Sequence, residues 1–145
     1  MLVRHVMSTP PITVESACPV TAALGLLSEH QVTALPVVDE QRRIIGVVSE
    51  RDLIRGRIPP DPAYGDPRAA TAVLPQTVGE VMSHVTVVVR PETDLAELGR
   101  LLAARSFRSV PVVDACDQVV GVVSRSDLVR ALVREEEQRD RVAGR

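Results

Sequence analysis

Aromatic residues and lysine are what this 145-residue sequence most clearly lacks. Aromatic side chains make up 1% of the chain, which holds Tyr64, Phe107 and no tryptophan. The hydrophobic core must therefore be aliphatic, and a stacking platform for single-stranded nucleic acid is excluded. All 17 cationic residues are arginine, and the formal net charge is -2, so no basic field exists to attract a phosphate backbone. We therefore expect no nucleic-acid partner.

Cysteines and long apolar runs are also scarce. Cys18 and Cys116 lie far apart and form no CxxC pair, which excludes a disulfide framework and a structural zinc site of the usual kind. His5 and His84 have no acidic or cysteine partner at ligand spacing, so we expect no metal site. No stretch approaches the roughly 18 apolar residues of a membrane span, and the N-terminus lacks the apolar run of a signal peptide. These absences predict a cytoplasmic protein without membrane contact.

The sequence does contain an internal repeat. After a shift of 75 residues, 18 of the 55 positions from 2 to 56 are identical to their counterparts. The matching segments are Val6–Ser8 with Val81–Ser83, Pro36–Asp39 with Pro111–Asp114, Gly46–Ser49 with Gly121–Ser124, and Asp52–Leu53 with Asp127–Leu128. A copy of about 55 residues buries little core alone, so we expect the two copies to pack face to face about a pseudo-twofold axis.

Both copies predict the same order of elements. Apolar residues three and four positions apart predict an amphipathic helix from Val20 and another from Leu95, the second with Thr93 as its N-cap. Valine-rich runs predict strand pairs whose turns contain Asp39 and Asp114. The other predicted elements are helical turns over Leu2–Met7 and Thr77–Met82, first strands over Ile12–Val14 and Thr86–Val89, later strands over Ala34–Asp39, Arg43–Ser49, Ser109–Asp114 and Gln118–Ser124, and last helices from Glu50 and Arg125. The predicted fold class is α+β, with β-α-β-β-α occurring twice.

Two segments fall outside the copies. Residues 57–76 contain five prolines, so we expect a surface connector without regular structure. Residues 134–145 alternate in charge, and we expect this tail to extend the last helix into solvent.

The repeated segments resemble a tandem pair of cystathionine-β-synthase (CBS) domains, also called a Bateman module. The resemblance is carried by Val-Met-Ser near the start of each copy, Pro-Val-Val-Asp in its middle and Gly-Val-Val-Ser-x-x-Asp near its end. It implies a first CBS domain over residues 1–56, a second over residues 77–133, and two clefts that bind adenosine-containing ligands. The implied ligands are AMP, ADP, ATP or S-adenosylmethionine, with or without Mg²⁺, and no cofactor is required.

The resemblance also implies which residues contact the ligand. Asp52 and Asp127 take the ribose hydroxyls, and Ser49 and Ser124 face phosphate. The implied walls of the base pocket are Thr9, Ile12, Ala34, Leu35 and Pro36 in the first copy, and His84, Val87, Ser109, Val110 and Pro111 in the second. The implied phosphate contacts on the basic side are His30 in the first copy and Arg105 and Arg108 in the second.

Ser-x-x-Asp at the start of a helix has a second interpretation. It is also the pattern of a capping box, in which serine is the N-cap and the carboxylate reaches back from the third helical residue. This interpretation explains both motifs without a ligand, and the two roles can coexist in one pair of residues.

No nucleophile with a base and an orienting group occurs in the sequence, nor does a P-loop, so we expect no enzyme. The first hypothesis is a regulatory module that signals ligand occupancy to a protein effector. The alternative is a ligand-free structural or dimerisation module. In both cases we expect a homodimer, with the apolar helices Leu95–Leu102 or Leu128–Val133 as candidate faces.

Overall fold

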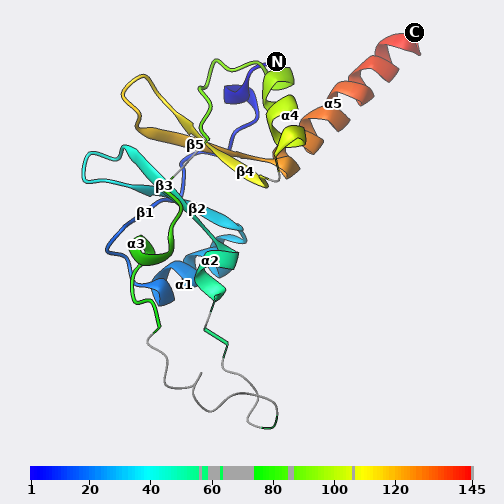
Figure 1. Ribbon diagram of the computed structural model, residues 1–145. Helices are drawn as coiled ribbons and strands as arrows, with labels where there is room; N and C mark the ends of the chain where they lie inside the picture. The colour runs from blue at the N-terminus through cyan, green and yellow to red at the C-terminus, as the bar shows by residue number, and fades with distance from the viewer. Residues whose placement is uncertain (56, 59–62, 64–73, 85–86, 106, 145) are drawn as a thin grey trace. The chain divides into compact units, whose positions relative to one another are not determined.

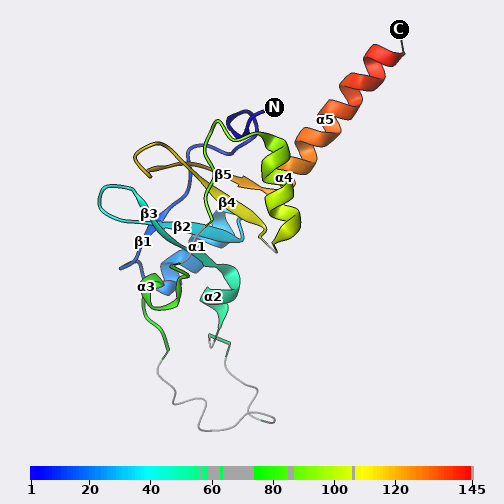
Figure 2. The same ribbon diagram turned by 45° about the horizontal axis from the view of Figure 1, so that its top comes forward.

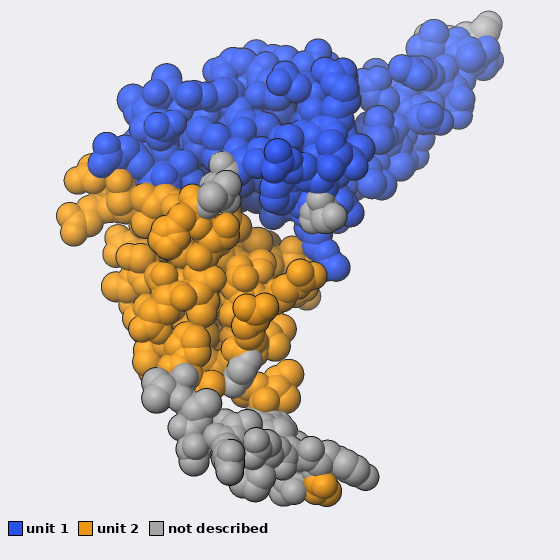
Figure 3. All heavy atoms as spheres, in the orientation of Figure 1, with its two compact units in different colours: residues 1–11, 42–44, 87–145 blue, residues 12–41, 45–86 orange. Residues whose placement is uncertain are grey.

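The computed structural model shows most of the expected helices and strands, in the expected order (Figure 1). The described residues are 1–55, 57–58, 63, 74–84, 87–105 and 107–144, so most of the predicted connector lies outside them. The chain divides into two compact units (Figure 3). Unit 1 contains residues 1–11, 42–44 and 87–145, and unit 2 contains residues 12–41 and 45–86. The predicted α+β class is confirmed.

Unit 2 holds the sheet of the first copy. Its strands have the order β1-β2-β3, and β1 pairs with β2 in parallel, with Val14 opposite Val37. The elements are β1 (Val14–Glu15), α1 (Val20–His30), β2 (Ala34–Val38), β3 (Ile44–Ser49, whose first residue belongs to unit 1), α2 (Glu50–Ile54) and α3 (Val78–Val81). The core is entirely aliphatic and includes Val20, Leu35 and Leu53. The predicted strands and helices of this copy therefore form, each within a few residues of its expected bounds.

Unit 1 holds the antiparallel pair of the second copy. The strands pair with Ser109 opposite Ser124, and a bulge follows Val112. The elements are η1 (Val3–His5), α4 (Leu95–Ala104), β4 (Ser109–Val113), β5 (Val119–Ser124) and α5 (Arg125–Ala143). The first strand that the sequence predicts here is reduced, among the described residues, to one parallel bridge between Val89 and Val112. The core is again aliphatic, with half-buried Phe107 packed against it.

The N-terminal segment of each copy packs in the unit that holds the sheet of the other copy. Val3 is fully buried in unit 1, and its backbone N–H donates to the carbonyl of Thr93 at 2.9 Å. Val78 is fully buried in unit 2, and its N–H donates to the carbonyl of Cys18 at 2.9 Å. The compact units are therefore not the two sequence copies, because the copies have exchanged their first segments.

The exchange explains why glycine occurs at the same position of both copies, as Gly46 and Gly121. A Cβ atom at Gly46 would lie 2.4 Å from the backbone oxygen of Ser83, and one at Gly121 would lie 2.8 Å from the Met7 sulfur. Val47 and Ser83 exchange two backbone hydrogen bonds, of 3.0 and 2.9 Å, directly beside Gly46. Each glycine therefore lets the exchanged segment approach the strand closely.

One predicted helix cap is wrong by one residue. The N-cap of α4 is Asp94, whose Oδ1 accepts from the N–H of Ala96 at 2.9 Å, and not Thr93. Thr93 instead closes the preceding turn, because its Oγ1 accepts from the N–H of Arg90 at 3.0 Å. Both residue types cap helices well, so spacing alone does not decide between neighbours.

The last helix extends through most of the charged tail, as expected. It covers 19 residues, whereas α2, its counterpart in the first copy, covers five. Figures 1 and 2 show the C-terminal part of α5 running away from the strands of unit 1. None of the helices in the described part of the chain is long and apolar enough to cross a membrane.

Candidate functional site

In the first copy, Ser49 and Asp52 form a complete capping box where β3 passes into α2. The N–H of Asp52 donates to Ser49 Oγ at 3.2 Å, and the N–H of Ser49 donates to Asp52 Oδ2 at 2.9 Å. The hydroxyl of Ser49 donates to the same Oδ2 at 2.9 Å. Asp52 is half-buried, and among the described residues its Oδ1 accepts no hydrogen bond.

In the second copy, Ser124 and Asp127 form the same box at the start of α5. The N–H of Asp127 donates to Ser124 Oγ at 3.1 Å, and the N–H of Ser124 donates to Asp127 Oδ2 at 2.8 Å. Here, however, Oδ1 is also engaged, because it accepts from Nη2 of Arg130 in an ion pair. Asp127 is 6% exposed and is the one buried charged residue of the described chain.

The capping interpretation of both Ser-x-x-Asp motifs is thus confirmed. A third box, between Thr77 and Glu80 at the start of α3, shows that the chain uses this device elsewhere. Capping uses only part of each carboxylate, because an ionised carboxylate offers about four lone-pair positions. Asp52 in particular keeps one oxygen that can accept hydrogen bonds from a ligand.

The strand residues assigned to the base pocket are mostly buried. Leu35 and Val110 are 0% and 1% exposed and belong to the aliphatic cores of units 2 and 1, respectively. Pro36 and Pro111 are also buried, while Ala34 and Ser109 at the strand starts are half-buried. Since the Leu35 and Val110 side chains fill the cores, these two residues have mainly backbone atoms to offer a ligand.

The residues assigned to the base pocket from the N-terminal segments are divided by the exchange. Thr9 is exposed in unit 1, together with Ser124 and Asp127, whereas half-buried Ile12 packs against the core of unit 2. Conversely, His84 is exposed in unit 2 and Val87 is half-buried in unit 1. Alignment of the copies groups Thr9 with Ile12 and His84 with Val87, but the compact units separate the members of each pair.

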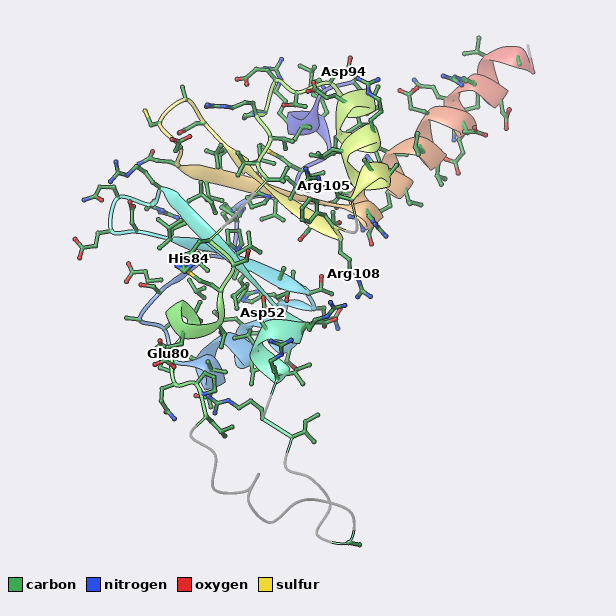
Figure 4. All side chains as sticks on the ribbon, viewed as in Figure 1. Asp52, Glu80, His84, Asp94, Arg105 and Arg108 are labelled. Carbon is green, nitrogen blue, oxygen red and sulfur yellow. The ribbon has the colours of Figure 1, made fainter. Side chains whose placement is uncertain are left out.

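The basic candidates lie at or shortly after the C-terminal ends of α1 and α4. His30 is the last residue of α1, is exposed, and precedes Gln31, which takes the left-handed conformation with φ 54°. Arg105 and Arg108 are exposed in the segment between α4 and β4 (Figure 4). Arg125 makes hydrogen bonds to this segment. Its N–H donates to the carbonyl of Arg108 at 2.9 Å, and its Nη2 donates to the carbonyl of Arg105 at 3.5 Å.

Other reactive groups are few. Across the described ranges, no group of three or more His, Cys, Asp or Glu residues could hold a metal ion. Cys116 is exposed in the turn between β4 and β5, and Cys18 is half-buried before α1. Burial raises the pKa of the Cys18 thiol. The residue that sequence reasoning missed is Arg130, although its position three residues after Asp127 on a helix is typical of an ion pair.

Comparison with known proteins reveals relatives along most of the chain. The CBS domain family profile matches residues 3–58 and 78–134. The chloroplastic CBS domain-containing protein CBSX2 of Arabidopsis thaliana is 34% identical over 138 residues, which cover 83% of this chain and 58% of the relative. The chain thus spans less than two thirds of the length of that relative.

Two solved structures are similar over most of their length. CBSX2 in complex with AMP has a TM-score of 0.79 at 32% identity and covers 93% of this chain and 98% of that one. The CBS domain pair of the protein MJ0100, in complex with 5′-methylthioadenosine and S-adenosyl-L-methionine, has a TM-score of 0.76 at 24% identity. It covers 93% of this chain and 98% of that one, and at this identity it supports the fold alone.

Proposed function

The chain belongs to the CBS domain family, with two copies in tandem, and from that premise we propose that it is a regulatory module that binds an adenosine-containing ligand. The observation that carries the proposal is the carboxylate of Asp52. Capping fixes one of its oxygens, and the other accepts no hydrogen bond from the described residues. The AMP complex of a relative 32% identical to this chain supports the choice of ligand class.

The proposed chemistry follows from the groups available. A carboxylate accepts hydrogen bonds from the two vicinal hydroxyls of a ribose, and capping holds the Asp52 and Asp127 side chains in place for that task. With Phe107 and Tyr64 the only aromatic residues, the base would rest on aliphatic side chains and backbone. AMP, ADP, ATP and S-adenosylmethionine remain the candidates, and no metal or other cofactor is part of the proposal.

We propose the basic residues as the source of selectivity for anionic ligands. His30 serves the first copy, and Arg105 and Arg108 serve the second. A guanidinium presents a planar fork of N–H donors that can bond two phosphate oxygens at once, whereas an imidazole ring has no such fork. This difference favours the phosphorylated ligands in the second copy.

For output we propose a protein effector and a homodimer, with no catalysis by the chain itself. The exposed apolar residues Val129, Leu132 and Val133 of α5 are 58%, 55% and 51% exposed and form the proposed dimer face. The other candidate face, Leu95–Leu102, is withdrawn, because Leu95, Leu98 and Leu102 are 9%, 0% and 4% exposed and form the core of unit 1. A cytoplasmic site of action stays a prediction.

Thermal unfolding with AMP, ADP, ATP and S-adenosylmethionine tests the proposal, using the unaltered chain, Asp52→Asn, Asp127→Asn and both together. A ligand at about 100 times its Kd adds about 2.7 kcal/mol to the free energy of unfolding, which raises Tm by roughly 5 to 15 °C. The double variant should lose this shift. Asp114→Asn is the matched control, because Asp114 Oδ1 accepts from the N–H groups of Cys116 and Gln118 in the turn between β4 and β5, and the substitution should leave the shift intact.

The ligand-free dimerisation module remains the second candidate. The capping boxes favour it, since they account for both serine–aspartate pairs without a ligand. If none of the four ligands at millimolar concentration shifts Tm while the chain still dimerises, this second function replaces the first. A shift that survives in the double variant would instead move the ligand away from the two carboxylates.

A further inference from the structure

An ion pair with Arg130 distinguishes the carboxylate of Asp127 from that of Asp52. Arg130 follows Asp127 by three residues, and its counterpart in the first copy, Arg55, follows Asp52 by the same interval. Arg130 lies inside α5, where its Nη2 pairs with Asp127 Oδ1. Arg55 is the C-cap of α2 with φ -52° and ψ 121°, and in the described chain it makes no ion pair with Asp52. The same residue type thus has two different environments.

The difference in pairing changes what each carboxylate can accept. Both oxygens of Asp127 are engaged, one by the N–H of Ser124 and one by the guanidinium, and the Asp127 side chain is 5% exposed. Asp52 has one engaged oxygen and one open oxygen. A hydrogen bond from a guanidinium to a carboxylate is charge-assisted and stronger than one from a ribose hydroxyl. A ligand at Asp127 must therefore share Oδ1 with Arg130 or displace it, and a ligand at Asp52 has no such competitor.

We propose that Arg130 is a specificity-determining residue that occupies the Asp127 carboxylate and lowers its affinity for a ribose diol, so that a nucleoside without phosphate fills the Asp52 site first. The inference rests on the proposed function, since it concerns the same carboxylates. Arg130 is displaceable, because its side chain is 63% exposed and its guanidinium can move into water at small cost. Binding at Asp127 then requires the exchange of one ion pair for two hydroxyl hydrogen bonds.

The test uses adenosine, which carries the diol but no charge, so that attraction between Arg130 and a phosphate does not enter. Calorimetric titration is made in the Asp52→Asn background, where Asp127 is the one remaining carboxylate of the pair. We expect Arg130→Met to lower the Kd of adenosine by about two- to tenfold, because the guanidinium is removed while an unbranched apolar side chain remains. The gain should largely disappear with 2′-deoxyadenosine, which lacks one of the two hydroxyls.

Arg55→Met in the Asp127→Asn background is the matched control, and the Kd of adenosine there should not change. Arg130→Gln repeats the test with a polar residue, and melting curves confirm that both variants fold. An unchanged or higher Kd in Arg130→Met overturns the role of Arg130 but leaves the proposed function in place. An equal gain with 2′-deoxyadenosine also overturns it. Failure of adenosine and of all four candidate ligands to bind any form overturns both the inference and the proposed function.

Discussion

The two copies carry the same Ser-x-x-Asp motif into helices of very different length. In the first copy α2 ends after five residues, and in the second α5 continues for 19. The motif alone determines the capping box, which forms in both copies with nearly equal distances. The arginine three residues later pairs with the carboxylate in the long helix, and its counterpart at the C-cap of the short helix does not. Identical sequence motifs are therefore not equivalent sites, because the structure beyond the motif sets their charge environment.

The largest expected difference between the copies concerns the leucine that follows each aspartate. Leu53 is 1% exposed in the core of unit 2, whereas Leu128 is half-buried against the core of unit 1. We expect Leu53→Ala to lower the free energy of unfolding by about 2–5 kcal/mol and Leu128→Ala by about 1–2 kcal/mol. Denaturant unfolding of both variants measures this difference. Equal losses would mean that the two helices are packed alike despite their lengths.

The second comparison concerns the close approach of the exchanged segments. A Cβ at Gly46 would collide with the backbone oxygen of Ser83, which is held by two backbone hydrogen bonds to Val47, whereas the first obstacle at Gly121 is the flexible end of Met7. We expect Gly46→Ala to cost about 2–3 kcal/mol of unfolding free energy and Gly121→Ala about 1 kcal/mol. Denaturant unfolding measures both losses. Gly25→Ala is the control, because nothing lies within 4 Å of a Cβ at that position. A reversed order would contradict the account of the exchange.

The smallest expected difference concerns the two thiols. Burial raises the pKa of Cys18, so less of it is thiolate at a given pH, and its alkylation should increase only at higher pH than for an ordinary cysteine. Cys116 is exposed in its turn and should react first. Iodoacetamide labelling between pH 7 and 10, followed by mass spectrometry of the peptides, measures both rates. In denaturant the two rates should converge, and a faster Cys18 in the folded chain would refute this order.

Much of the fold could be predicted because the repeat supplies each element twice. Paired valines and regularly spaced leucines specify strands and helices locally, and for β2 to β5 the predicted bounds differ from the observed ones by one residue at one end. Local signals fail where two neighbours suit one role, as with Thr93 and Asp94. They also fail for the apolar face of α4, because the sequence reveals that a helix is amphipathic but not whether its face meets a core or a partner.

The candidate site was less predictable than the fold. The capping geometry of Ser49 and Asp52 follows from residue type and spacing, and it was anticipated as an alternative. The separation of Thr9 and Ile12 into different units was not anticipated. Alignment assigns a segment to its own copy and carries no information on which sheet the segment joins. The role of Arg130 was missed although the sequence predicts that the last helix continues past it, because residue spacing permits an ion pair with Asp127 but does not show that one forms.

The exchange of first segments has a consequence for how such a chain can be divided. A fragment that ends in the connector would contain the sheet of the first copy but would lack Val78, and its core would have a vacancy of one valine side chain. The complementary fragment would lack Val3 in the same way. Each half alone would therefore have an incomplete core, and a mutation in the first segment of one copy acts on the unit that holds the sheet of the other.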